Sequence, residues 1–272
     1  MKLTSLLLLL SSASVLLASD VFLTPSSLGD WSFVSTDSNG IPCLGCNSGS
    51  VVFGPGTPPI GNGSANLQTV SGGGDGAESF LNPDYDGTLI SALTSLSYST
   101  YDTANNGSQF PYLEIYINTA GGSTWDSANG DKLFFEPPYQ TPSAGSSSCP
   151  DQGATAMTTW QTWDALGGCW WDDNGNANPG TGVLPFSTFL TAFPNATIVS
   201  DPNGNGGIHF TVGYASPSDN FDGNITNITI GVNGADTTFG FTVAPEPGSV
   251  GMCLAGFTAL WLARGARRKR LL

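Results

Sequence analysis

Positive charge is almost absent from the middle of this 272-residue chain. Of its seven Lys and Arg residues, only Lys132 lies between Asp20 and Glu246, whereas all 21 Asp and Glu residues lie in that span. One positive charge against 21 negative charges leaves the span 20 charges negative, more acidic than the −14 of the whole chain. Such a surface repels phosphate backbones, so we expect no nucleic-acid partner. Without Arg, the span also lacks bidentate clamps for phosphate or acidic sugars.

Residues that several enzyme classes need are also scarce. His209 is the only histidine, which excludes a histidine-rich metal site. A Ser-His-Asp triad would have to use it, but no G-x-S-x-G motif accompanies it, and an ordinary strand histidine is the simpler interpretation. No phosphate-binding or dinucleotide-binding glycine motif occurs in a strand-turn-helix context.

Turn-forming residues are abundant. The chain has 36 Gly and 18 Pro with only 10% charged residues, which is typical of a turn-rich all-β protein. In residues 112–118, Leu113, Ile115 and Ile117 point one way and polar or aromatic side chains the other. Runs of this kind predict ten to twelve strands and favour a two-sheet antiparallel sandwich of jelly-roll type. The expected strands cover residues 31–34, 50–53, 65–70, 96–101, 112–118, 132–136, 159–164, 169–171, 197–199, 208–214, 225–232 and 237–243.

One segment, at about 185–193, has the pattern of a helix. Pro185 suits a first helical turn, and Phe186, Phe189, Leu190 and Phe193 recur at helical spacing. Pro194 then prevents the helix from continuing. We therefore expect one short helix in an otherwise all-β domain that covers residues 20–243.

Residues 1–19 have the pattern of a signal peptide. Lys2 precedes the apolar runs 6–10 and 15–17, and cleavage is expected near the small residues Ala18 and Ser19. An N-terminal membrane anchor is the weaker alternative, because Ser and Ala at 11–14 interrupt the run.

Residues 244–272 have the composition of a membrane-sorting tail. Pro245, Glu246 and Pro247 precede sixteen uncharged residues, 248–263, and a cluster of Arg and Lys at 264–270. As a helix, the run measures about 24 Å at ~1.5 Å per residue, somewhat short for a bilayer core of ~30 Å, and its basic flank stays cytoplasmic. The three parts resemble the bacterial PEP-CTERM sorting signal. The resemblance implies export, a C-terminal transmembrane helix that anchors the chain transiently, and processing by an exosortase-type enzyme. A permanent single-span anchor is the alternative.

Five segments of the middle are together similar to an uncharacterised family of secreted bacterial domains. The resemblance spans roughly residues 30–243 and implies export and a sandwich fold, but no mechanism. The segments are 133–137, 160–164, 168–171, 193–196 and 221–225.

Four cysteines fall in the domain. An even number in a secreted chain favours disulfides, and four cysteines allow three pairings. A Cys149–Cys169 pair would close a loop of about 21 residues and leave Cys43 to pair with Cys46 across a tight turn. A four-thiolate zinc site and a redox Cys-x-x-Cys are the alternatives, but a second Cys-x-x-Cys and a surrounding βαβ pattern are missing.

Three loops carry oxygen ligands at calcium-like spacing. Asp201, Asn203 and Asn205 match the first half of a D-x-N-x-N-G loop, but the twelfth position is Val212 rather than Glu, so the loop is not an EF-hand. Asn-Gly and Asp-Gly pairs are also ordinary turn residues. We hypothesise that at least one structural Ca²⁺ binds, and we expect no other cofactor. The two similar clusters are Asp172, Asn174 and Asn176, and Asp126, Asn129 and Asp131.

Aromatic residues and acceptors suggest a sugar-binding face. Pyranose rings stack on aromatic side chains and hydrogen-bond to carboxylates and amides. Aromatics also fill sandwich cores, and adjacent Trp170 and Trp171 must point to opposite sides of a strand, so at most one of them is in the core. The predicted glycan contacts are Trp125, Trp160, Trp163 and Tyr116.

Glu114 and Glu136 are the best pair for glycoside hydrolysis, because they lie on neighbouring predicted strands. Outward-facing polar residues are the ordinary interpretation of both. The sequence therefore predicts a non-enzymatic protein at the cell surface or in the extracellular matrix. Its expected role is structural or adhesive in an exopolysaccharide layer, with glycan contact. A glycosidase that uses Glu114 and Glu136 is the alternative.

Overall fold

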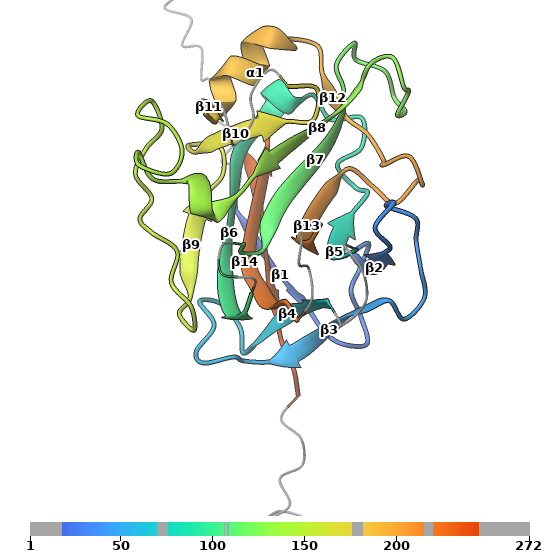
Figure 1. The fold of residues 1–272 in the computed structure, drawn as a ribbon. Coiled ribbons are helices and arrows are strands. Elements are labelled where there is room, and N and C mark those ends of the chain that lie inside the picture. Colours follow the sequence, from blue (N-terminus) through green and yellow to red (C-terminus); the bar gives the residue numbers. More distant parts are fainter. Residues whose placement is uncertain are drawn as a thin grey trace, which may run out of the picture.

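Two β-sheets face each other in this computed structural model, which describes residues 18–69, 76–105, 107, 109–175, 182–214 and 220–244 (Figure 1). The predicted signal peptide up to residue 17 and the tail from Pro245 lie outside the described residues. Within those residues, no helix is long and apolar enough to cross a membrane. The described residues confirm the predicted all-β sandwich with one short α-helix.

The first sheet, called the β14 sheet here, has the order β1-β15-β4-β14-β6-β9, with β3 paired to β4. All of its pairings are antiparallel except that of β1 with β15, which is parallel. Its strands are β1 Ser19–Leu23, β3 Asn47–Phe53, β4 Gly63–Thr69, β6 Leu93–Ala104, β9 Gln161–Asp164, β14 Asp222–Val232 and β15 Ala235–Phe241.

The second sheet, called the β7 sheet, has the order β11-β10-β8-β7-β13-β5-β2, with β12 paired to β7. All of its pairings are antiparallel. Its strands are β2 Ser32–Thr36, β5 Ala77–Asn82, β7 Tyr112–Asn118, β8 Gly130–Phe135, β10 Cys169–Asp172, β11 Leu184–Pro185, β12 Thr197–Ile198 and β13 Ile208–Gly213.

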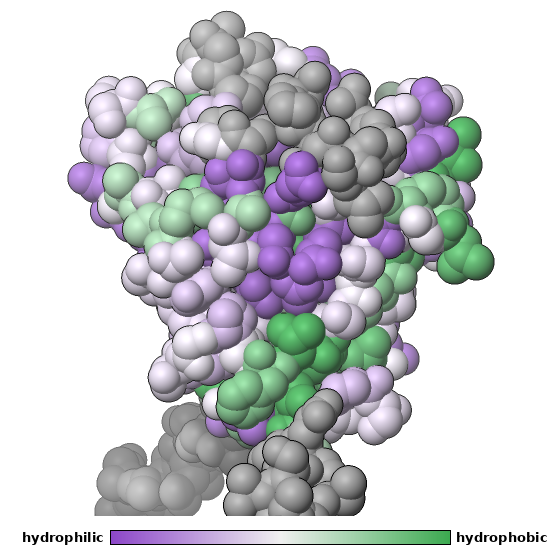
Figure 2. All heavy atoms as spheres, turned by 60° about the horizontal axis from the view of Figure 1, so that its bottom comes forward, coloured by the Kyte–Doolittle hydropathy of each residue, from purple (hydrophilic) through white to green (hydrophobic). Residues whose placement is uncertain are grey.

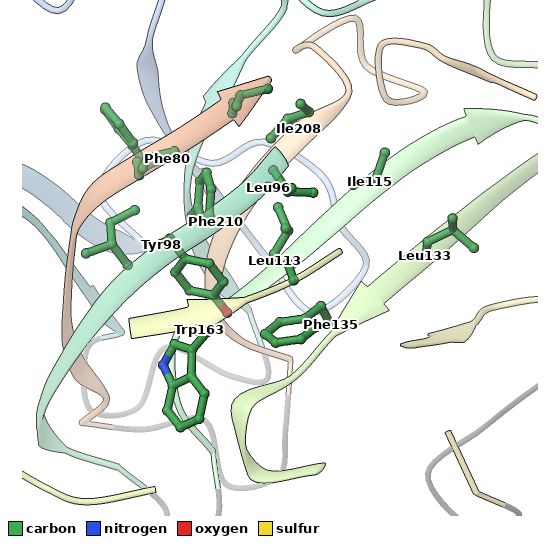
Figure 3. Close-up of a cluster of buried hydrophobic side chains, with 14 of the residues drawn as sticks. Phe80, Leu96, Tyr98, Leu113, Ile115, Leu133, Phe135, Trp163, Ile208 and Phe210 are labelled. Carbon is green, nitrogen blue, oxygen red and sulfur yellow. The ribbon is translucent and has the colours of Figure 1, made fainter. Parts of the chain in front are cut away.

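The alternation in β7 explains how the two sheets share one core. Leu113, Ile115 and Ile117 are completely buried between the sheets, while Tyr112 and Glu114 point to the outer face, as the period of two requires. Figure 3 shows the resulting cluster, to which Tyr98 and Leu96 of β6 and Phe210 of β13 contribute from facing strands.

Strand β14 contains an irregularity that the alternation alone does not predict. Ile225 and Ile228 are both buried, although they differ by an odd number of positions. The register with β6 shifts between Thr226 and Thr229, and Asn227 there has a φ of 52°. This β-bulge inserts one extra residue, so both isoleucines face the core.

The helix α1, Phe186–Ala192, lies beside β10 and β11 at one end of the sandwich (Figure 1). Its buried Phe186 and Phe189 are the inner side of the predicted helical stripe, and Pro185 precedes the first turn. The helix predicted at 185–193 is confirmed to within one residue at each end.

Three of the strands were not predicted. β1 follows the expected cleavage region and pairs with β15. β5 lies between β13 and the edge strand β2 and is buried along its whole length, but the polar residues Glu78, Ser79 and Asn82 make its sequence unlike that of a buried strand. β11 has only two residues. Tertiary pairing therefore made strands of segments whose composition is not strand-like.

Both expected cysteine pairs are at disulfide-bonding distance. The Cα atoms of Cys43 and Cys46 are 5.8 Å apart, and those of Cys149 and Cys169 are 5.7 Å apart. The second pair joins a long loop to β10 and packs with Val183 in a small buried cluster of its own.

Exposed apolar side chains lie at the margins of the fold. Figure 2 shows one end of the molecule, where hydrophobic side chains gather beside a hydrophilic area. Large exposed apolar residues occur on β1 and β3, including Phe22 and Phe53, and in loops, such as Leu44. The central strands β7 and β14 contribute none among the described residues.

Candidate functional site

A pocket of about 580 Å³ lies on the outer face of the β7 sheet. Outward-facing side chains of β2, β5, β13, β7, β8 and β10 line it, and the loops around Asn39 and Pro202 border it. An Asn203 Nδ2 hydrogen bond of 3.3 Å to the Gly40 carbonyl oxygen joins the two loops. Pockets of this size and polarity hold small organic ligands in other proteins.

Aromatic rings form much of this surface. Phe134 and Trp171, on the paired strands β8 and β10, stack with ring centroids 4.0 Å apart and 12° between their planes. Tyr116 contacts Trp125 edge-on at 5.6 Å and His209 at 4.8 Å between centroids. The side-chain alternation of adjacent strands thus gathers apolar ring faces at one place.

Lys132, the only Lys or Arg between Asp20 and Glu246, lies among these rings. Lys132 Nζ is 3.7 Å from Glu114 Oε1 and 3.5 Å from Asp173 Oδ2. It also lies 5.2 Å from the ring centroid of Phe134 and 5.8 Å from that of Tyr116, within cation–π range. The ammonium group therefore compensates the charge of Glu114, whose residue is 2% exposed.

Glu136 is the second pocket carboxyl, one residue past β8. Burial raises the pKa of Glu136 to about 7, although a hydrogen bond of 2.9 Å donated by Trp171 Nε1 acts in the opposite direction. At neutral pH, Glu136 is therefore divided between its protonated and ionised forms and can either donate or accept a proton.

Two tyrosines of the pocket remain neutral phenols. The pKa values of Tyr112 and Tyr116 are raised well above the ordinary value, first by burial and then by the neighbouring Glu114 carboxylate. Tyr214, at the rim, hydrogen-bonds Thr36 Oγ1 through its hydroxyl at 2.5 Å. These hydroxyl groups add polar recognition to the aromatic surface.

Six residues were predicted as glycan contacts or catalytic carboxylates, and the structure brings four of them together. Glu114, Glu136, Tyr116 and Trp125 all line the pocket. Asp201 and Asn203, from the predicted calcium loop, lie at its border.

The two other predicted glycan contacts lie elsewhere. Trp163 is completely buried in the core, and its Nε1 donates a 2.9 Å hydrogen bond to Thr100 Oγ1. Its prediction as a glycan contact is wrong, because no ring surface is left for a ligand. Trp160 flanks β9, on the β14 sheet, and packs on Tyr101 with its Nε1 bonded to the Pro55 carbonyl oxygen. It does not line this pocket.

The loop at Asp201 is closed by its own hydrogen bonds. Asp201 Oδ1 accepts the backbone N–H groups of Asn203 at 2.8 Å and Asn205 at 2.9 Å, and Oδ2 accepts from Asn205 Nδ2 at 3.0 Å. These bonds favour the turn interpretation of this loop over a cation site. Among the described residues, no group of three or more His, Cys, Asp or Glu side chains is arranged to hold a metal.

Several pocket residues were not predicted. Trp171 lies on the outer face while Trp170 is buried, which confirms that the pair points to opposite sides. His209 faces the pocket directly opposite Glu114 in the β13–β7 register, and its Nε2 lies 2.8 Å from the Gly206 carbonyl oxygen. The alternation of Lys132, Phe134 and Glu136 was the signal in the sequence that could have revealed their shared face.

Comparisons with models of protein families, with curated proteins and with solved structures found no match for this chain.

Proposed function

We propose that this protein is an exported β-sandwich that binds a neutral glycan in the pocket on the β7 sheet. The observation that carries the proposal is the combination of the Phe134–Trp171 stack with the Tyr116–Trp125 pair around polar groups. Sugar C–H faces pack on such rings while carboxylates and hydroxyl groups receive the sugar hydroxyls.

The charge of the domain selects the class of glycan. With Lys132 already paired to Glu114 and Asp173, the pocket offers no uncommitted Lys or Arg among the described residues. A polysaccharide rich in uronic acid, sulfate or phosphate would meet uncompensated negative charge. Neutral hexose or pentose polymers are therefore the ligands that this pocket favours.

The cellular setting of the proposal comes from the two ends of the chain. We propose that residues 1–19 direct export, and that the Pro245-Glu246-Pro247 tail anchors the protein transiently until an exosortase-type enzyme processes it. The domain then acts as a structural or adhesive component of an exopolysaccharide layer, without catalysis. Its strand path, which crosses repeatedly between the two sheets, supports a jelly-roll classification.

Calorimetric titration with neutral oligosaccharides tests the binding proposal. We expect Trp125→Ala to weaken binding about tenfold, equal to ~1.4 kcal/mol, because it removes one aromatic wall. Trp160→Ala is the matched control, since that ring is also partly exposed but lies on the other sheet. Unchanged binding in Trp125→Ala together with lost binding in Trp160→Ala would place the ligand elsewhere and refute the proposal.

Glycoside hydrolysis is the second candidate, and the raised pKa of Glu136 favours it. Glu114 pairs with Phe134 in the β7–β8 register, two residues from Glu136. Such diagonal neighbours have backbone positions about 7–8 Å apart, and both carboxyl groups line the pocket, as the two acids of a glycosidase would have to. Glu136 would protonate the leaving oxygen, and Glu114 would activate water.

Reducing-sugar release from the bound oligosaccharide separates the two candidates. An enzyme would release sugar and lose this activity in Glu136→Gln and Glu114→Gln. A binding protein would show saturable binding and no release in the wild type. We expect binding without release.

A further inference from the structure

Two carboxylates lie on the inner side of the β7 sheet, behind the pocket. Asp131 of β8 shares its face with the completely buried Leu133, and Asp172 of β10 shares its face with the completely buried Trp170. Each of the two aspartates is 1% exposed. Carboxylates this deeply buried require compensation from hydrogen bonds or positive charge.

The two aspartates are close neighbours across paired strands. Asp172 pairs with Leu133 in the β10–β8 register, so Asp131 is its diagonal neighbour on the same face. Burial raises the pKa of Asp131, and the charge of Asp172 raises it further. Lys132, adjacent to Asp131 in sequence, points to the pocket face instead, where it pairs with Glu114 and Asp173.

One oxygen of this pair has no hydrogen-bond partner among the residues that the structure describes. Asp131 Oδ1 accepts backbone N–H groups from Lys132 at 2.8 Å and from Asn174 at 3.3 Å. Asp131 Oδ2 is buried and has no hydrogen-bond partner. A buried acceptor without a hydrogen bond destabilises the folded state by roughly 1–3 kcal/mol, and by more when it is charged. A further group that binds this oxygen would remove that cost.

The surrounding loops favour a cation as that group. Asp172, Asn174 and Asn176 were predicted to offer calcium-like oxygens, and Asn176 lies outside the described residues. Asn174 lies against the start of β8, where its Nδ2 donates a 3.3 Å hydrogen bond to the Gly130 carbonyl oxygen. Asn174 of one predicted calcium cluster therefore lies beside Asp131 of another. Asp126, predicted in one cluster with Asp131, has partners on both oxygens: Oδ1 accepts the backbone N–H groups of Ala128 and Asn129, and Oδ2 accepts from Asn118 Nδ2 at 2.9 Å.

We propose that a Ca²⁺ ion binds between Asp131 and Asp172. Two carboxylates balance its charge, and Ca²⁺ completes its six to eight ligands with water and with amide or carbonyl oxygens. Zinc sites draw three or four protein ligands from Cys, His and carboxylates, and the described residues hold no such group of three. Because Lys132 and Trp171 adjoin the two aspartates, the ion would also brace the wall of the pocket.

Thermal melting of the oxidised protein at pH 7.5, with and without Ca²⁺, tests this proposal. At a hundredfold excess over Kd, we expect the melting temperature to rise by about 5–10 °C. Asp131→Asn should abolish the shift. It should also melt above the metal-free wild type, because it removes the repulsion with Asp172 but keeps an acceptor for both N–H groups. Asp126→Asn and Asp201→Asn are matched controls that should retain the shift.

Terbium luminescence gives a second readout, which is measured on the wild-type protein and so does not require a variant to fold. Tb³⁺ bound beside Trp170 and Trp171 should emit on tryptophan excitation, and added Ca²⁺ should quench the emission. Absence of both the melting shift and the emission in the wild type would overturn the proposal. A shift that persists in both Asp131→Asn and Asp172→Asn, or disappears only in Asp201→Asn, would overturn it equally.

Discussion

The buried carboxyl group of Glu78 should make the free energy of unfolding depend on pH. Its residue is 1% exposed, and its carboxylate lies on the inner face of β5, in contact with Ser35 Oγ and beside Gly49. Burial raises the pKa of Glu78 from 4.5 to about 7, against the opposing effect of the Ser35 hydrogen bond. The carboxyl group therefore holds its proton in the folded protein at pH values where the unfolded chain has released it.

The sign of the pH dependence follows from this difference. The native state binds more protons than the unfolded state between pH 4.5 and 7, so the free energy of unfolding decreases as pH rises through that window. At ~1.36 kcal/mol per pH unit, the group costs about 3 kcal/mol above pH 7 and nothing below pH 4.5. Glu78→Gln, which keeps the shape and an acceptor for Ser35, should remove this dependence.

Urea unfolding at pH 4.5 and pH 8 measures the effect. We expect Glu78→Gln to unfold at the same urea concentration as the wild type at pH 4.5, and at about 1–2 M more urea at pH 8. Asp102 and Glu136, whose pKa values burial also raises to about 7, act equally in both proteins and cancel in the comparison.

Asp20→Asn is the control for net charge, because Asp20 is exposed on β1 and its replacement removes one negative charge without touching the core. It should shift unfolding little at either pH. A Glu78→Gln variant whose stability difference from the wild type is the same at both pH values would refute the reasoning.

Two further predictions concern stability. Trp163→Ala should cost about 3–5 kcal/mol, because it opens a cavity and removes the bond to Thr100; a loss near that of Trp160→Ala, read from urea unfolding, would contradict the burial of Trp163. Replacing Cys149 and Cys169 together by Ser should lower the free energy of unfolding by roughly 3 kcal/mol, since the pair closes a loop with a sequence separation of 20. Equal denaturation midpoints for this variant and the wild type would show that the closure contributes nothing.

The regular parts of the fold were predictable because their pattern is local. The alternation in β7 and the helical spacing in α1 reflect which side of each element is buried, and neither depends on knowing its partner. The bulge at Asn227 and the strand β5 were not predictable in this way. Both depend on a neighbouring strand, which supplies hydrogen bonds that composition does not reveal.

The candidate site was predictable only in part. Tyr116 and Glu114 share a face by alternation within one strand, and Glu136 was placed near them by the assumption that neighbouring predicted strands pair. Trp160 and Trp163 are close in sequence to Trp170 and Trp171, yet β9 belongs to the other sheet. These four tryptophans are close in sequence but lie in three places: Trp163 and Trp170 in the core, Trp160 on the β14 sheet, and Trp171 in the pocket.

Composition and periodicity alone indicated a strongly acidic, strand-rich sandwich with one helix, because charge, turn residues and alternation are properties of short segments. Which side chains meet was decided by the tertiary structure. The pairing of β8 with β10 set both the ring stack of Phe134 and Trp171 and the position of Asp131 beside Asp172. Such contacts arise from pairing across long stretches of chain, where each residue's neighbours depend on register rather than on the residues beside it in sequence.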